Sequence, residues 1–248
     1  MQTIRRTNRE SLGSSLGAAS QMRATLAPKP MFEAVLFDCD GVLVDSERIT
    51  NTVLRDMLAQ IGWSMTLEEC MHLFVGKTVR DERREIEKQT GHAFFEDWLQ
   101  QFYVQRNQAL EASVQIVEGA MSAVQAAHRL CQGRIACASG ADRIKLTMQL
   151  SKTLLLPYFE GRIFSGHEMP RSKPAPDVYL AAAAALQVQP QRCLVIEDTT
   201  IGARAGVSAG ATVWAYCPDP SAEVALLQLG ASRTFASMAQ LPSLLGLD

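Results

Sequence analysis

Two aspartates, Asp38 and Asp40, stand directly after the apolar run 34–37. Side chains two residues apart in an extended chain point the same way, so the two carboxylates are expected close together at a strand end. Gly41 permits the sharp turn that follows. Close carboxylates repel one another unless a cation or a proton lies between them. The pair therefore suits a hard divalent ion, or a nucleophile that works with an acid; a solvated strand end is the alternative.

Three further polar clusters are candidates for a site. Two of them follow apolar runs, and the third lies in a proline-rich loop. Ser139 and Gly140 offer a hydroxyl and backbone N–H groups for an anion, although Ser139 is equally a candidate helix N-cap. Lys173 lies among three prolines in 170–176, which stiffen its loop, and a lysine suits a phosphate or a carboxylate. Glu197 and Asp198 are acids that a cation would neutralise. Together these clusters predict metal-assisted phosphoryl transfer through a carboxylate nucleophile.

The elements that must position these clusters are short apolar strands that alternate with helices. Such alternation predicts a parallel, doubly wound α/β sheet, whose functional sites lie beyond the carboxyl ends of its strands. Each polar cluster that follows an apolar run is expected at such an end. The expected strands are 34–37, 134–138, 162–164, 193–196 and 211–215, and the expected helices between them lie near 120–131, 143–150, 177–186 and 201–209.

Residues 48–114 form a different block, in which apolar residues recur at helical spacings of three and four. We expect a small helical domain here, inserted between 31–47 and 115–248 of the α/β core. Gly62 and Gly91 are expected to end two of its helices, and Thr78 to cap the start of one. The expected helices are 50–61, 67–74, 78–90 and 94–110.

Residues 1–30 differ from the rest in carrying five basic residues against one acid, with no sustained apolar period. A disordered or removable extension is favoured, including a start placed too early, because Met31 directly precedes the first strand. An organelle transit peptide is the other interpretation of a segment rich in Arg and Ser. A cytoplasmic location is expected, with organelle targeting open but not favoured.

Composition restricts the partners. The chain has 248 residues, of which 47% are hydrophobic, and a net charge of −2, so no basic field favours nucleic acid. No apolar run approaches the roughly 20 residues that span a bilayer, so no membrane partner is expected. The six cysteines form no C-x-x-C pair and indicate a reducing compartment. The sequence does not fix the oligomeric state; a monomer is favoured.

The four clusters, in their order along the chain, resemble the haloacid dehalogenase (HAD) superfamily, from Asp38-Cys-Asp40-Gly-Val to Glu197-Asp198. The resemblance covers about residues 32–245, and the helical block is similar to the C1-type cap. It implies a Rossmann-like parallel sheet flanked by helices. Asp38 would be the nucleophile that forms an aspartyl-phosphate, and Asp40 the general acid and then base.

The resemblance also implies a ligand set. Mg²⁺ would be held by Asp38, the Asp40 backbone carbonyl and Asp198, with Glu197 acting mainly through water. Ser139, the Gly140 backbone and Lys173 would hold the phosphoryl group.

Within the superfamily the chain is most similar to sugar-phosphate phosphatases and β-phosphoglucomutases. Mutases usually carry a histidine where this chain has Thr50, and their loops differ at 76–79 and 139–143. A phosphatase of a small phosphorylated sugar or sugar acid is therefore favoured over a mutase. A non-catalytic binding protein is the remaining alternative, and it would be expected to have a broken motif. Glu47, Lys77 and Arg80 are the candidate specificity residues.

Overall fold

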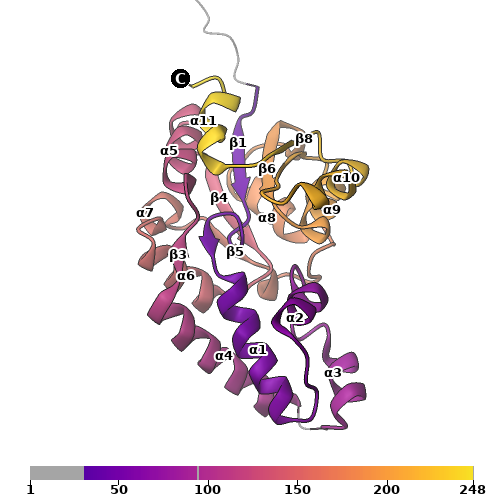
Figure 1. Cartoon of the computed structure of the whole chain (residues 1–248). Coiled ribbons are helices and arrows are strands. Elements are labelled where there is room, and N and C mark those ends of the chain that lie inside the picture. Colours follow the sequence, from indigo (N-terminus) through magenta and orange to yellow (C-terminus); the bar gives the residue numbers. More distant parts are fainter. Residues whose placement is uncertain (1–30, 94, 248) are drawn as a thin grey trace, which may run out of the picture. The chain divides into compact units, whose positions relative to one another are not determined.

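The computed structural model describes residues 31–93 and 95–247 (Figure 1). A six-stranded sheet, ordered β5-β4-β1-β6-β7-β8, forms its centre, and every neighbouring pair is parallel. The strands are β1 (Ala34–Phe37), β4 (Ile135–Ser139), β5 (Ile163–Ser165), β6 (Cys193–Glu197), β7 (Thr212–Tyr216) and β8 (Arg233–Phe235). The expected parallel α/β sheet is confirmed; β8 was not expected.

Helices cover both faces of this sheet because strand residues alternate between two cores. Val35 and Phe37 of β1 belong to one hydrophobic cluster, and Ala34 and Leu36 belong to the other. The helices that contribute to the first cluster include α5 (Ala120–Leu130), α6 (Arg143–Lys152), α7 (Leu156–Phe159) and α11 (Leu241–Leu244). Those that contribute to the second are α8 (Asp177–Ala185), α9 (Thr200–Ser208) and α10 (Glu223–Gln228). Burial on both faces explains why β1 is apolar throughout.

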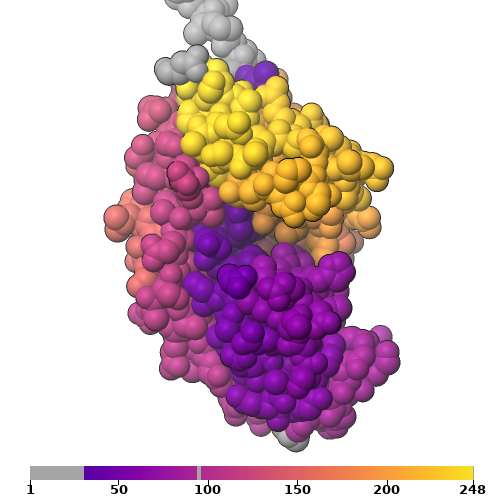
Figure 2. All heavy atoms as spheres, in the orientation of Figure 1, coloured from indigo at the N-terminus to yellow at the C-terminus, as the bar shows by residue number. Residues whose placement is uncertain are grey.

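Four helices within residues 47–113 bury a third cluster, which includes Leu54, Leu58 and Phe102. We refer to these helices as the cap. In the space-filling view, the indigo and purple residues of its first two helices form a continuous surface region (Figure 2). The cap helices are α1 (Glu47–Gln60), α2 (Leu67–Phe74), α3 (Arg83–Thr90) and α4 (Phe95–Ser113). A two-stranded antiparallel pair, β2 (Val44–Asp45) with β3 (Gln115–Ile116), joins the cap to the sheet, and the sequence did not predict it.

The third cap helix begins later than expected. Residues 79–82 form turns, and Thr78 Oγ1 accepts a hydrogen bond from Asp81 N at 3.2 Å, so Thr78 caps this turn. The helix proper begins at Arg83 and ends at Thr90, and Gly91, with a positive φ of 69°, provides the left-handed C-cap. The interpretations of residues 1–30 lie outside the described residues. In the part of the chain that is described, no helix has both the length and the apolar character needed to cross a membrane.

Candidate active site

Lys173 joins the ends of two neighbouring strands. Its Nζ lies 2.7 Å from Asp38 Oδ1, after β1, and 2.6 Å from Glu197 Oε1, the last residue of β6. Tyr179 on α8 completes the group: its hydroxyl lies 2.9 Å from Lys173 Nζ and donates to Glu197 Oε1 at 2.7 Å. All four side chains are at least 90% buried. The ammonium thus has three oxygen partners, which fixes its position beside Asp38.

Tyr179 is a member of this group that sequence reasoning missed. It is the one residue of the Ala-rich helix α8 with both a large ring and a hydroxyl. A buried tyrosine normally finds a hydrogen-bond partner for its hydroxyl, which was the available signal. The sequence could not indicate that this partner would be Glu197.

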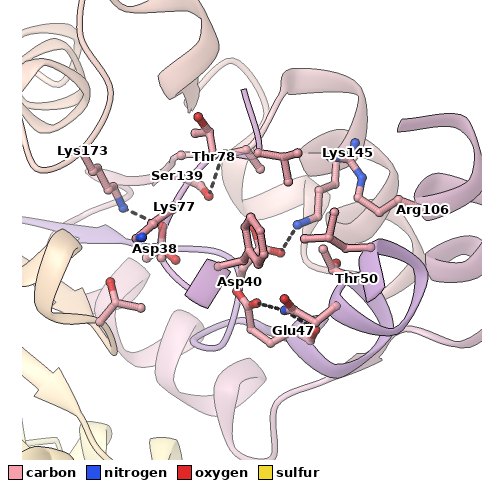
Figure 3. Close-up of a pocket in the computed structure, with 18 of the residues that line it drawn as sticks. Asp38, Asp40, Glu47, Thr50, Lys77, Thr78, Arg106, Ser139, Lys145 and Lys173 are labelled. Atoms are coloured by element: carbon pink, nitrogen blue, oxygen red, sulfur yellow. Dashed lines mark hydrogen bonds and ion pairs between the residues drawn. The ribbon is translucent and has the colours of Figure 1, made fainter. Parts of the chain in front are cut away.

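Asp40 has its own set of donors, all of which converge on one oxygen. Asp40 Oδ1 accepts from Lys145 Nζ at 2.7 Å, from Gln149 Nε2 at 3.1 Å and from Ser46 Oγ. Lys145 and Gln149 lie four residues apart and therefore on one face of α6. Figure 3 shows Lys145 reaching Asp40 from the side of the pocket opposite Lys173. A lysine and a glutamine at helical spacing gave only a weak signal, and none of the three donors was predicted.

The two aspartates experience opposite electrostatic environments. Burial raises the pKa of Asp38 to about 7; the Lys173 ammonium opposes the rise, while the Glu197 and Asp40 carboxylates add to it. For Asp40, burial alone would raise the pKa, but Lys145 and the hydrogen bonds from Ser46 and Gln149 lower it below the ordinary value. Without a cation Asp38 is therefore the more readily protonated of the two, and a cation bound beside Asp38 would favour its ionised form.

Asp38, Glu197 and Asp198 bring carboxylate oxygens within 4.8 Å of one another. Glu197 already uses both of its oxygens, because Oε1 accepts from Lys173 and Tyr179 and Oε2 accepts from Asp198 N, Thr199 N and Thr199 Oγ1. Asp198 Oδ1, in contrast, is buried and has no hydrogen-bond partner among the described residues. An orphaned carboxylate oxygen beside two further acids is a donor set that fits a hard divalent cation.

The pKa of Asp198 is consistent with a cation site among these acids. Burial raises the pKa of Asp198 well above its ordinary value, and the Glu197 and Asp38 carboxylates raise it further. A cation bound among these acids would favour their ionised forms and so reverse the rise. Because Glu197 is saturated, Asp38 and Asp198 are the side chains left to contact a metal directly, and Glu197 is suited to holding Lys173 and the 198–199 turn.

Gly41 allows Asp198 to approach the end of β1. A Cβ at Gly41 would lie 2.0 Å from Asp198 Oδ2, and the φ of +77° is one that other residues rarely adopt. A β-carbon at position 41 and the present position of Asp198 are therefore incompatible.

Ser139 ends β4 in the same pocket. Its Oγ accepts from Ala141 N at 3.3 Å, and its side chain is buried. The N-cap of α6 is Asp142, whose Oδ1 accepts from Lys145 N at 2.9 Å. The alternative that Ser139 caps this helix is therefore wrong. No atom outside the local chain lies within 4 Å of a Cβ built at Gly140, so there is open space beside the Ser139–Gly140 turn.

One cavity of about 100 Å³ lies between the carboxyl ends of the strands and the cap helices α1 and α4 (Figure 3). Of the site residues expected from the sequence, all but two line it: Asp38, Asp40, Glu47, Lys77, Ser139, Gly140, Lys173 and Glu197. Asp198 and Arg80 do not line it, and Arg80 pairs with Glu96 at 3.1 Å. Thr78 lines it but was predicted only as a cap. The specificity roles of Glu47, Lys77 and Arg80 stay predictions.

Glu47 and Lys77 contribute to the cap side of this cavity. Burial raises the pKa of Glu47 to about 7, and the Asp40 carboxylate adds to the rise while Lys145 opposes it. Asn51 Nδ2 donates to Glu47 Oε2 at 3.2 Å. Lys77 Nζ lies 3.3 Å from Glu82 Oε1 and remains partly exposed. Glu47 and Lys77 therefore bring a carboxyl group and an ammonium from the cap to a cavity whose floor is formed by the strand ends.

Three comparisons relate this site to known proteins. A family model described as haloacid dehalogenase-like hydrolase matches residues 32–210. A protein of Escherichia coli named 6-phosphogluconate phosphatase is 29% identical over 213 residues, which are 86% of this chain and 94% of that protein.

Two solved structures are similar in fold and sequence. A haloacid dehalogenase-like protein from Agrobacterium tumefaciens has a TM-score of 0.73 and 31% identity, over 87% of this chain and 98% of the other. A HAD family hydrolase from Deinococcus radiodurans, whose structure contains phosphate and sodium, has a TM-score of 0.68 and 34% identity, over 88% of this chain and 96% of the other.

Proposed function

The chain belongs to the haloacid dehalogenase-like hydrolase family, and on that premise we propose that it hydrolyses the phosphomonoester of a small sugar or sugar acid through an aspartyl-phosphate on Asp38. One observation carries the proposal: Lys173 Nζ lies 2.7 Å from Asp38 Oδ1 in a cavity that Asp40, Ser139 and Gly140 also line. The name of the Escherichia coli relative supports a phosphorylated sugar acid.

In this proposal an Asp38 oxygen attacks the phosphorus atom and forms an acyl phosphate, while the bond to the leaving oxygen breaks. Asp40 gives a proton to that leaving oxygen and later takes one from the water that hydrolyses the intermediate. Lys173, the Ser139 hydroxyl and the Gly140 N–H hold the phosphoryl oxygens. The Lys145, Gln149 and Ser46 contacts occupy Asp40 Oδ1, which supports Oδ2 as the oxygen that moves the proton.

Mg²⁺ is the cofactor we propose. Asp38, Asp198 and the Asp40 carbonyl would hold it, with Glu197 behind them, since Glu197 has both of its oxygens engaged. When bound, the ion would neutralise charge on the phosphoryl group and on the acids around it. The orphaned oxygen of Asp198 is the support for this assignment.

Substrate contacts are proposed for Glu47 and Lys77, which line the cavity, and more weakly for Arg80, which lies outside the lining. We also propose that residues 48–114 act as the cap domain over a core of 31–47 and 115–248. A monomer in the cytoplasm remains the favoured setting.

A phosphosugar mutase is the main alternative. Thr50 lines the cavity at the position where mutases carry a histidine, and a threonine cannot supply an imidazole to a returning sugar hydroxyl. This supports the hydrolase. A non-catalytic protein is disfavoured because Asp38, Asp40, Lys173 and Asp198 are all present.

The test is the release of inorganic phosphate from a panel of sugar and sugar-acid phosphates, with Mg²⁺ and with EDTA. We expect Mg²⁺-dependent release that Asp38→Asn abolishes. Asp45→Asn is the matched control, because Asp45 is exposed on β2 in the same stretch. Activity that survives in Asp38→Asn would overturn the nucleophile. Interconversion of sugar phosphates that depends on glucose 1,6-bisphosphate, without release of inorganic phosphate, would identify the mutase.

A further inference from the structure

Arg106 is a buried arginine in the cavity wall that the proposed chemistry does not use. It belongs to α4, its side chain is 6% exposed, and it lines the cavity. Figure 3 shows Arg106 beside Lys145, on the side opposite Lys173. A charge buried to this degree is unfavourable unless it is paired, so the contacts of the Arg106 guanidinium indicate its role.

The contacts of Arg106 use one edge of the guanidinium. Nη2 lies 2.6 Å from Asp142 Oδ2 and 2.8 Å from Asn107 Oδ1, and Nε donates to Asn107 Oδ1 at 3.1 Å. The guanidinium carbon lies 4.8 Å from the centre of the Tyr103 ring. Across residues 31–93 and 95–247, no hydrogen bond is made by Nη1. The group is therefore fixed in place with part of its donor set unused.

The other cations of the cavity have their charges engaged with acids. Lys173 contacts Asp38 and Glu197, Lys145 contacts Asp40, and Lys77 contacts Glu82. Arg106 also has an acidic partner, Asp142, but a planar guanidinium can bind one carboxylate on one edge and another anion on the next. Arg106 is the guanidinium in this set, and its Nη1 has no hydrogen-bond partner in the described part of the chain.

A second polar atom without a partner lies in the same wall. Thr50 Oγ1 is buried and has no hydrogen-bond partner within the described part of the chain, and Thr50 lines the cavity. Buried hydroxyls are normally satisfied, so this atom is suited to a ligand or a water. His167 also lines the cavity. Burial lowers the pKa of its imidazole, and the positive charges of Arg106 and Arg80 lower that pKa further, while the Asp142 carboxylate opposes the change.

We propose that Arg106 Nη1 and the Thr50 hydroxyl form a subsite for a second anionic group of the substrate. The preferred substrate is then a phosphomonoester that carries a carboxylate or a second phosphate on its leaving group, not a neutral sugar phosphate. This inference rests on the proposed function, because the subsite and the phosphoryl site share one cavity.

The first experiment uses the wild-type chain and pairs of substrates that differ in one charged group. 6-Phosphogluconate and glucitol 6-phosphate differ only in a carboxylate against a hydroxymethyl group, and fructose 1,6-bisphosphate with fructose 6-phosphate provides the second-phosphate arm. A charge-assisted hydrogen bond predicts a kcat/KM higher by about tenfold or more for the anionic member of one pair. The pair that shows the difference identifies the anion.

The second experiment uses Arg106→Met, which keeps the aliphatic stem, and Arg106→Lys, which keeps the charge. We expect Arg106→Met to lower kcat/KM about 10- to 100-fold for the anionic substrate and less than about threefold for its neutral partner. Arg106→Lys should recover part of the loss. Arg84→Met is the matched control, because Arg84 is an exposed cap arginine outside the cavity lining.

Equal losses on both members of a pair would show that Arg106 only holds α4 against Asp142, and would overturn the proposal. So would a wild-type chain that does not distinguish the members of either pair. If Arg106→Met does not fold, as judged by circular dichroism, the wild-type comparison and the milder Thr50→Val variant decide the matter. Hydrolysis of no substrate at all would instead be a failure of the proposed function.

Discussion

Lys145 and Asp40 form a buried ion pair, with Nζ 2.7 Å from Oδ1 and side chains 6% and 12% exposed. The pair joins helix α6 to the end of β1, and no local sequence pattern connects the two. Gln149, one turn further along α6, donates to the same oxygen at 3.1 Å. Helix α6 therefore sets the orientation of the residue that we propose as the general acid and base.

Replacement of Lys145 by Met should leave the Asp40 charge buried without its cation. Removing one partner of a buried pair typically costs about 3–5 kcal/mol, so we expect the free energy of unfolding to fall by about 3 kcal/mol and kcat by roughly 100-fold. Denaturant unfolding and steady-state kinetics measure the two effects. Adding Asp40→Asn to this variant should recover stability but not activity. Lys152→Met, at an exposed position on the same helix, should change neither.

Tyr179→Phe should test the group around Lys173. The substitution removes the hydroxyl that donates to Glu197 at 2.7 Å and leaves the ring in place. A hydrogen bond to a charged group contributes about 1.5–3 kcal/mol, and we expect a stability loss of this size with a kcat lowered about tenfold. Tyr158→Phe is the control: it removes a hydrogen bond with Gln125 outside the cavity, and it should leave kcat unchanged. An unaltered kcat in Tyr179→Phe would show that Lys173 is held without the hydroxyl.

Asp198→Asn should change the melting temperature in opposite directions with and without metal. Burial and the neighbouring acids raise the pKa of Asp198, so its ionised form is unfavourable when no cation is present. In EDTA we expect the variant to melt at a higher temperature than the wild type. Mg²⁺ should raise the Tm of the wild type and should not raise that of the variant. At an Mg²⁺ concentration 100 times its Kd, binding would add about 2.7 kcal/mol to the free energy of unfolding of the wild type. A variant that Mg²⁺ still stabilises would place the ion elsewhere.

Gly41→Ala should be far more harmful than the same change at Gly91. Both glycines have positive φ, +77° and +69°, but a Cβ meets Asp198 at 2.0 Å only at position 41. Gly91→Ala should cost about 1 kcal/mol through backbone strain alone. Gly41→Ala adds a clash with Asp198, so its loss of stability, measured by chemical unfolding, should exceed the Gly91→Ala value severalfold and should be accompanied by loss of Mg²⁺ stabilisation. Equal losses in the two variants would mean that Asp198 moves aside freely.

The parallel sheet was predictable because its signals are local. The strands β1, β4 and β6 are apolar runs buried on both faces, and the polar residues at or directly after their ends had to meet at one edge once the strands were parallel. The helical block was predictable for the same reason, from its apolar periodicity. Strand β8 and the short β2–β3 pair were not, because two or three residues carry too little pattern.

The amino-acid sequence by itself determined which chemical groups stand at the strand ends: Asp38, Asp40, Ser139 and Glu197-Asp198, with Lys173 on its proline-rich loop. Only the tertiary structure decided how they are divided between tasks. In the folded chain both carboxylate oxygens of Glu197 accept hydrogen bonds, whereas Asp198 Oδ1 has no partner among the described residues. Folding also brings Gln149 to Asp40, which lies 109 residues away in the chain. It also turned Arg106 of the cap toward Asp142 of the core. Such contacts join residues distant in the chain, so spacing cannot reveal them; packing fixes them.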